Sequence, residues 1–159
     1  YTTNDILTSV IQDIKYGYIE ASISVLEESL TTLFTHFSDT MARVDYIVPI
    51  PLHKKRYAAR GFNQAHTIAK VVAKSSRKPM VLPLVRIRNT KQQALLQKEE
   101  RKTNIINAFS VVPDSSIFGK HMLLVDDVYT TGATMNECAK VLSAAGAQSV
   151  SGFVLAKGE

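Results

Sequence analysis

Two adjacent carboxylates at the end of an apolar run, followed by small and hydroxyl-bearing residues, form the strongest chemical signal in the sequence. The stretch reads LLVDDVYTTGAT and covers residues 123–134. Asp126 and Asp127 can hold sugar hydroxyls or a metal ion through their oxygens. Residues 130–134 supply hydroxyl donors, and Gly132 lets the backbone approach an anion closely. If these residues open a helix, its free N–H groups complete a cradle for a phosphate.

The two halves of this stretch predict a ligand with two kinds of groups. Carboxylates aimed at a phosphate would repel it, so we expect the acids to face ribose hydroxyls or a cation while the loop binds the phosphate. A purely structural explanation, in which the acids end a strand and the hydroxyls cap a helix, suits an isolated Asp-Asp pair better than the whole stretch. No Walker-type Gly-x-x-x-x-Gly-Lys-Ser/Thr and no dinucleotide-type Gly-x-Gly-x-x-Gly occurs. The sequence therefore predicts a sugar phosphate as the ligand.

Positive charge is concentrated in the middle of the chain. The 159 residues carry a net charge of +5. Residues 1–45 contain 2 basic and 7 acidic side chains, residues 46–102 contain 14 and 2, and residues 103–159 contain 3 and 5. A middle region of net charge +12 indicates an anionic partner, either the phosphates of a small molecule or those of a nucleic acid. A solvated surface of Lys and Arg is the alternative.

The apolar pattern predicts an α/β domain that positions these residues. The run over residues 121–128 is typical of a strand buried on both faces of a parallel sheet. A loop over 129–134, a helix over 135–145 and a strand over 149–155 complete a strand–loop–helix–strand unit. The rest of the chain predicts helices over 4–15, 21–37 and 64–74, and strands over 44–48, 80–87 (interrupted by Pro83) and 108–112. It also predicts a basic loop over 52–60 and a mobile hood over 88–104.

Composition excludes several classes of protein. With 45% hydrophobic and 21% charged residues, the chain is not predominantly disordered. Its one cysteine, Cys138, excludes a disulfide scaffold and a cysteine-based zinc site within this chain, and we expect it to be a small buried residue of a helix. No apolar run approaches about 18 residues and the start has no signal-peptide features, so we expect no membrane span and a cytoplasmic location.

Residues 126–134 resemble the phosphoribosyl-diphosphate loop of the type I phosphoribosyltransferases. Two further stretches resemble the ComF family, a phosphoribosyltransferase-like family associated with bacterial DNA uptake. One runs from Val48 to His53, VPIPLH, and continues through Arg56 to RGFNQ at 60–64; the other comprises Thr90, Gln93, Leu96, Arg101, Asn104, Ala108 and Phe109. The resemblance implies one type I phosphoribosyltransferase-like domain over residues 1–159, with a mostly parallel sheet flanked by helices and a flexible hood. The four-cysteine zinc finger usual in the family is absent from this chain, so we expect no zinc.

The resemblance also implies roles for individual residues. Asp126 and Asp127 would face the ribose hydroxyls and a Mg²⁺ ion. The 5-phosphate would bind to Thr130, Thr131, Gly132, Ala133 and Thr134. The pyrophosphate would meet Leu52, His53, Lys54, Lys55, Arg56 and Arg60. Gln93 and Arg101 would reach the ligand from the hood, whose closure would exclude water.

Two hypotheses about function remain open. The first is a ComF-like phosphoribosyltransferase that binds phosphoribosyl diphosphate with Mg²⁺, acts in DNA uptake during natural transformation, and transfers the ribosyl phosphate to a nucleophile with loss of pyrophosphate. The second is a non-catalytic module that retains the sugar-phosphate site and either binds single-stranded DNA or has a regulatory role. Single-stranded DNA and proteins of the DNA-uptake machinery are the expected macromolecular partners. A nucleotide-salvage phosphoribosyltransferase is a third reading, although no purine or pyrimidine pocket motif is present.

Several single residues also keep two interpretations. His53 could contact a phosphate or act as an acid or base, or it could simply be exposed. Arg60 could bind the diphosphate or pair with an aspartate. Tyr129 could stack on a base or cover the end of the strand. For Phe62 and Asn63 we expect a structural part, organising the loop and the start of the next helix.

Overall fold

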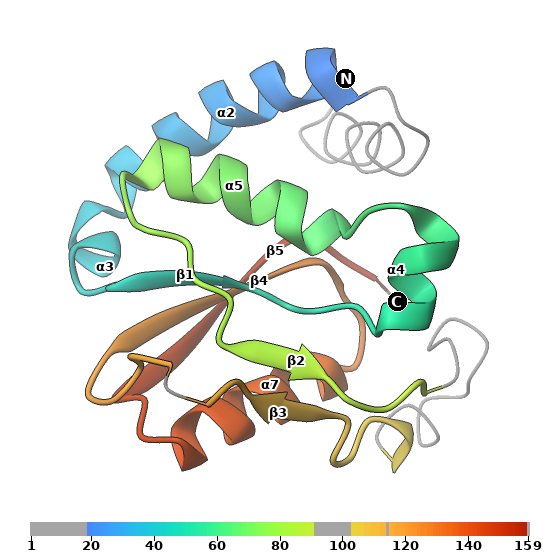
Figure 1. Ribbon diagram of the computed structural model, residues 1–159. Helices are drawn as coiled ribbons and strands as arrows, with labels where there is room; N and C mark the ends of the chain where they lie inside the picture. Colours follow the sequence, from blue (N-terminus) through green and yellow to red (C-terminus); the bar gives the residue numbers. More distant parts are fainter. Residues whose placement is uncertain (1–18, 91–102, 114, 159) are drawn as a thin grey trace.

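The computed structural model describes residues 19–90, 103–113 and 115–158 (Figure 1). The helix predicted over 4–15 and the hood residues Gln93 and Arg101 lie outside these ranges. The described helices are α2 (Ile19–His36), α3 (Ser38–Ala42), α4 (Lys54–Arg60), α5 (Gln64–Ser76) and α7 (Ala133–Ala144). The described strands are β1 (Tyr46–Pro49), β2 (Leu84–Arg86), β3 (Phe109–Val111), β4 (His121–Tyr129) and β5 (Ser149–Lys157).

Three of the strands form a parallel sheet in the order β1-β4-β5. The central strand β4 places Leu124 opposite Val48 of β1 on one side and opposite Gly152 of β5 on the other. The strands β2 and β3 form a separate antiparallel pair. The prediction of a mostly parallel sheet flanked by helices is confirmed.

The strand predicted over 80–87, with an interruption at Pro83, forms only in the part that follows the proline. Only Leu84–Arg86 forms a strand, because Pro83 interrupts the segment, and this strand pairs with β3 outside the main sheet. Met80 makes a single isolated parallel bridge with Ile47 of β1. The segment therefore touches the main sheet at one end and leaves it at the other.

The main sheet is buried on both faces (Figure 1). Alternate residues of β1 and β4 point to opposite sides, and this places Ile47, Leu123 and Val125 in the core under α2 and α5. Val48, Met122 and Leu124 belong to the other core, together with residues of α7, β2 and β3. This two-sided burial explains why the strand reads as a continuous apolar run.

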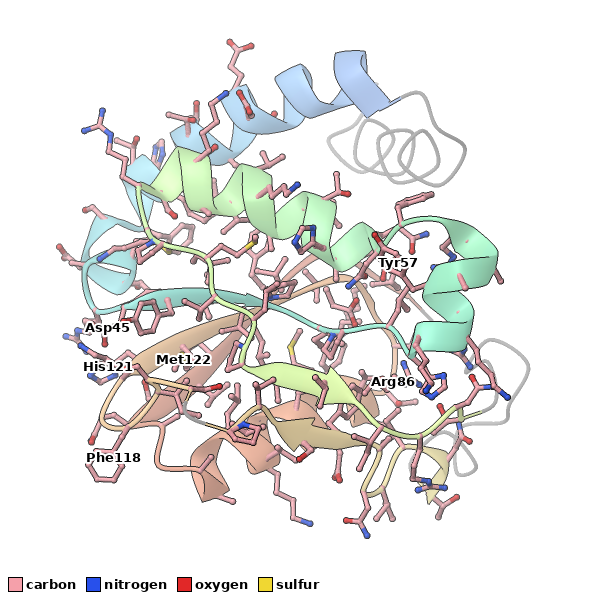
Figure 2. The ribbon with its side chains drawn as sticks, viewed as in Figure 1. Asp45, Tyr57, Arg86, Phe118, His121 and Met122 are labelled. Carbon is pink, nitrogen blue, oxygen red and sulfur yellow. The ribbon has the colours of Figure 1, made fainter. Side chains whose placement is uncertain are left out.

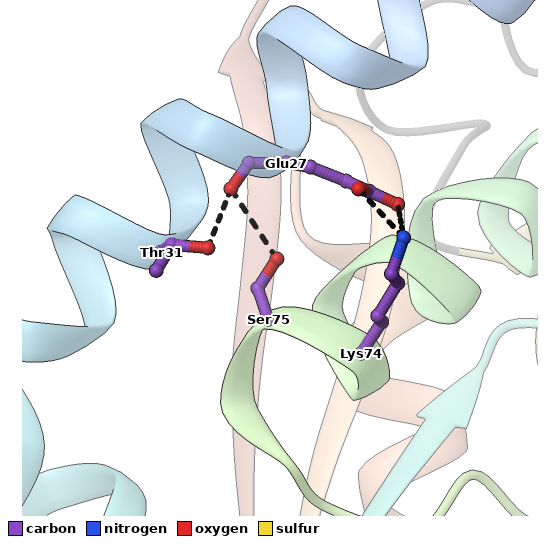
Figure 3. Close-up of polar contacts among 4 residues, drawn as sticks. All are labelled: Glu27, Thr31, Lys74 and Ser75. Carbon is purple, nitrogen blue, oxygen red and sulfur yellow. Dashed lines mark hydrogen bonds and ion pairs between the residues drawn. The ribbon is translucent and has the colours of Figure 1, made fainter.

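Helix α2 lies across α5 and is joined to it by polar contacts around Glu27 (Figure 3). The Lys74 ammonium donates to both carboxylate oxygens of Glu27, at 2.9 and 2.8 Å. The hydroxyls of Thr31 and Ser75 donate to the Glu27 carbonyl, at 2.7 and 3.4 Å. Since the Lys74 side chain is largely exposed, this ion pair contributes less than the apolar contacts of Leu30 and Phe34 beneath it.

The basic loop predicted over 52–60 is wrong, because residues 54–60 form the short helix α4. His53 is extended, and its ring accepts a hydrogen bond from the Lys55 N–H at 3.3 Å, as an N-cap. Gly61 ends the helix with a φ of +85°. Between these caps, KKRYAAR consists mainly of good helix formers.

The expectation that Cys138 is a small buried residue of a helix is confirmed. Cys138 is fully buried in α7, and this burial raises the pKa of its thiol, as suits a small core residue. None of the described helices has both the length and the apolar character needed to cross a membrane.

Candidate functional site

A cleft of about 730 Å³ opens where β1 and β4 end, at the carboxyl edge of the parallel sheet. Ligands of open α/β sheets bind at this edge. The cleft brings together most of the residues predicted from the sequence, namely Asp126, Asp127, Thr130, Gly132, Ala133, Thr134, Leu52, Arg56 and Arg60. The acids, the loop and part of the basic segment therefore share one site.

The two acids lie in the second half of β4, as its sixth and seventh residues. The Asp126 Oδ1 atom accepts a hydrogen bond from the Asp127 N–H at 3.0 Å, and the Asp127 Oδ1 atom accepts one from the Val128 N–H at 2.9 Å. Burial, followed by the charge of Asp127, raises the pKa of Asp126 to about 8. A proton, a cation or hydrogen-bond donors beside this pair are therefore favoured.

The loop after β4 has the backbone that a close approach to an anion requires. Gly132 has a φ of +74° and lies at the N-cap of α7, where its carbonyl accepts the Asn136 N–H at 2.8 Å. The Thr131 hydroxyl accepts the Ala133 N–H at 3.4 Å and so shapes the turn, although it does not line the cleft. A Cβ atom added to Gly132 would collide with the Tyr129 ring. Tyr129 thus lies against the loop and narrows the space around it.

Helix α4 divides the predicted basic residues between two faces. Arg56 and Arg60, four residues apart on one face, line the cleft, and the Arg60 guanidinium donates to the Gln64 side-chain oxygen. His53 and Lys54 instead line a second groove, and Lys55 lines neither. The structure therefore does not bring His53, Lys54 and Lys55 to the acids.

His53 acts as the cap of α4. The residue is only 7% exposed, and desolvation, followed by the nearby cations, lowers the pKa of its ring. This favours the neutral imidazole, which is the form that accepts the Lys55 N–H.

Asn63 organises the start of α5, as expected. Its side-chain oxygen accepts the Ala65 N–H at 3.2 Å, and its amide donates to the Ile50 carbonyl at 3.0 Å. The same residue thereby caps the helix and holds the segment that leaves β1. Phe62 packs against the core beside it.

Arg86, on β2, also lines the cleft, although no sequence motif singled it out. Its guanidinium lies 5.3 Å from the centre of the Phe109 ring. Burial, followed by the charge of Arg56, lowers the pKa of Arg86 to about 10, so it is still cationic at neutral pH. Figure 2 shows Arg86 and Tyr57 on the side of the molecule where α4 lies. An arginine ending an apolar strand was the only available signal, and the many other cations of residues 86–102 obscured it.

The carboxylates in the cleft suit Mg²⁺ better than a metal ion that needs three or more protein ligands. In the described ranges, no group of three or more His, Cys, Asp or Glu side chains could hold a metal ion. Asp126 and Asp127 each use Oδ1 for a backbone N–H, which leaves Oδ2 as a further acceptor. Two carboxylates fit Mg²⁺, which typically takes one or two protein carboxylates and completes its shell with phosphate oxygens and water.

The chain matches the family described as the phosphoribosyl transferase domain over residues 58–159. It is 33% identical over 156 residues to competence protein ComFC of Bacillus subtilis, covering 98% of this chain and 61% of that protein. It is 32% identical over 154 residues to DNA utilization protein YhgH of Escherichia coli, covering 95% of this chain and 67% of that protein. The chain therefore spans less than two thirds of the length of the Bacillus relative.

A solved structure with a similar fold is adenine phosphoribosyltransferase from Leishmania donovani. The TM-score is 0.50 at 15% sequence identity, and the match covers 89% of this chain and 52% of that chain. At this identity the likeness concerns the fold, which is a single phosphoribosyltransferase-type domain.

Proposed function

Since the chain belongs to the type I phosphoribosyltransferase superfamily and, within it, to the ComF family, we propose that it binds phosphoribosyl diphosphate together with Mg²⁺. The observation that carries this proposal is the cleft, where two carboxylates, a glycine-containing loop at a helix N-terminus and three arginines meet. The names of the relatives, competence protein and DNA utilization protein, support a role in DNA uptake. We place this role in the cytoplasm.

Each part of the ligand has a matching set of groups in the cleft. The loop of residues 130–134 takes the 5-phosphate through backbone N–H groups and hydroxyls. Asp126 and Asp127 accept hydrogen bonds from the ribose hydroxyls. Arg56 and Arg60 offer the paired donors that bind phosphate oxygens well.

The reaction is transfer of the ribosyl 5-phosphate to a nucleophile. The bond from ribose C1 to the diphosphate oxygen breaks, a bond from C1 to the nucleophile forms, pyrophosphate leaves, and the nucleophile loses its proton. The arginines stabilise the charge that develops on the leaving pyrophosphate, while the acids orient the ribose. Asp126 and Asp127 would hold Mg²⁺, which would supply further charge neutralisation.

Titration calorimetry with Mg²⁺ and phosphoribosyl diphosphate tests this proposal. Changing both Asp126 and Asp127 to Asn should weaken binding by about 100-fold or more, because each hydrogen bond to a charged group contributes ~1.5–3 kcal/mol. Asp39→Asn is the matched control, since Asp39 is exposed on α3, outside the residues that line the cleft. Unchanged affinity in the folded double variant would remove the acids from the site.

A second candidate function, single-stranded DNA binding, is favoured by the groove beside the cleft. This groove of about 610 Å³ lies between α4 and β2 and is lined by Tyr57, Lys54 and Ile87, among others. Tyr57 is 53% exposed and Ile87 57%, beside an exposed lysine. An exposed ring next to cations offers a stacking surface for bases and contacts for phosphates.

The binding of an oligothymidylate across a range of salt concentrations tests this second candidate. Each neutralised phosphate contributes ~0.7 to the log–log slope for single strands. Tyr57→Ala should weaken binding at least fivefold, since stacking contributes ~1–3 kcal/mol per base. Phe37→Ala, which removes a ring of similar exposure (55%), should leave it unchanged. Absence of binding at low salt would exclude this function for the chain.

A further inference from the structure

We propose that Arg86 and Arg56 act as a pair that binds the diphosphate, and that Thr90 is the positioning residue that holds the two guanidinium groups together. The two arginines come from different elements, β2 and α4, and both line the cleft. This inference rests on the proposed function and names further residues for it.

Thr90 bonds to both arginines. The Arg86 Nη2 atom donates to the Thr90 hydroxyl at 2.5 Å, and the Arg56 Nη2 atom donates to the Thr90 carbonyl. Thr90 is only 7% exposed. A buried residue that accepts from two guanidinium groups with separate atoms fixes the distance between them, which lowers the entropy lost when an anion binds.

The pair carries positive charge without a matching negative partner. Within residues 19–90, 103–113 and 115–158, the ion pairs are Lys74–Glu27 and Lys120–Asp45, and neither involves Arg56 or Arg86. The two guanidinium groups lie close enough for each charge to affect the other, since Arg56 lowers the pKa of Arg86. Asp126 attracts the charge of Arg86, but the ion pairs found in the described ranges do not join the two. Two like charges held side by side are relieved by an anion of charge greater than one.

Arg86 keeps a donor for such an anion. Its Nε atom is buried and has no hydrogen-bond partner among the residues that the structure describes. Buried polar atoms are rarely left unpaired in proteins, and an exception calls for an explanation such as an absent ion. The ring of Phe109 lies against the guanidinium and so helps to fix the plane of the group. A diphosphate has the oxygens and the charge to bind both arginines at once.

The experiment compares two probes, Mg²⁺–pyrophosphate and ribose 5-phosphate, by titration calorimetry. Arg86→Met should weaken pyrophosphate binding by about 10- to 100-fold and leave ribose 5-phosphate within twofold, because the phosphate loop is untouched. Arg86→Lys keeps the charge and loses the planar guanidinium, so its pyrophosphate affinity should lie between those of the parent and Arg86→Met. This variant replaces Arg86→Met in the test if the methionine variant does not fold. Arg88→Met is the matched control, since Arg88 is exposed, lies outside the cleft and donates to the Ile106 carbonyl.

Variants of Thr90 test positioning directly. Thr90→Val keeps the shape and removes the hydroxyl, so pyrophosphate affinity should fall about 3- to 10-fold. Thr90→Ser keeps the hydroxyl and should bind as the parent does, a rescue that general loss of packing would not produce.

Equal pyrophosphate affinity in the parent, the folded Arg86 variants and Thr90→Val would overturn this inference alone, provided that the parent binds phosphoribosyl diphosphate. A parent that binds pyrophosphate through Arg86 but neither ribose 5-phosphate nor phosphoribosyl diphosphate would overturn the proposed function and leave the arginine pair standing. A parent that binds none of the three would overturn both.

Discussion

Gly132→Ala is a sensitive test of the phosphate loop, because one methyl group brings two separate costs. The residue has a φ of +74°, a region that costs a non-glycine residue roughly 1–2 kcal/mol. In addition, the new Cβ atom would overlap the Tyr129 ring, so the ring or the loop must move. If the ligand requires the parental loop, the backbone cost alone corresponds to an affinity loss of about 5- to 30-fold.

Two companion variants separate these costs. Gly119 has a similar φ of +69°, nothing lies within 4 Å of its Cβ position, and it is remote from the cleft. Gly119→Ala should therefore lower the free energy of unfolding by about 1–2 kcal/mol and leave ligand binding unchanged. Adding Tyr129→Ala to Gly132→Ala removes the overlap and retains the backbone cost, so the double variant should recover part of the lost affinity.

The assays are calorimetry with ribose 5-phosphate and denaturant unfolding monitored by circular dichroism. The cradle assignment requires that Gly132→Ala loses affinity and Gly119→Ala does not. If both variants bind the sugar phosphate as the parent does, with similar losses in stability, the anion does not approach the backbone at Gly132 and the reasoning fails.

Three further predictions concern stability. Desolvation lowers the folded-state pKa of His53, so the unfolded chain binds the proton more tightly and stability should fall as pH drops below the unfolded-state pKa of about 6.5. His53→Asn, which keeps a good N-cap, should flatten this pH dependence in thermal unfolding, and an unchanged slope would contradict the prediction. Glu137→Ala should lower the free energy of unfolding by about 1.5–3 kcal/mol in denaturant titrations, because the Glu137 carboxylate accepts the Asn107 N–H at 2.7 Å. Glu137→Gln, which keeps an acceptor oxygen, should lower it less, and equal losses in the two variants would count against the importance of this hydrogen bond. The hydrogen bond from the His121 N–H lowers the pKa of Asp45, so the ionised Asp45 stabilises the fold above its unfolded pKa of about 3.8. This stabilisation is lost as the pH falls below that value. The melting temperature of Asp45→Asn should therefore depend less on pH in the acid range than that of the parent.

The strand–loop–helix unit around Asp126 could be predicted from the sequence because its information is local. The apolar run, the acids and Gly132 follow one another in a single stretch, and each has one dominant structural meaning. The sheet edge then brings this stretch to the exit of β1 by topology alone.

The contribution of Arg86 could not be predicted in this way, because it depends on contacts far apart in sequence. The strand β2 has three residues, too few for a clear alternation, and Arg86 pairs with Phe109 of β3, 23 positions later. The helix α4 was missed for a different reason. Its N-cap is a histidine, which is not among the residues that usually mark a helix start.

The net charge of the middle region predicts an anionic partner, and the structure divides the cations behind this prediction between two spaces. A single basic face would make a diphosphate and a DNA strand compete for the same cations. The helix α4 separates them instead, with Arg56 and Arg60 in the cleft and Lys54 beside Tyr57 in the groove. Arg86, Pro51 and Leu52 line both spaces, and Arg86 is the cation among these three. Any coupling between sugar-phosphate binding and DNA binding through a shared charge therefore depends on Arg86, whereas changes at Tyr57, which lines the groove and not the cleft, should affect the groove alone.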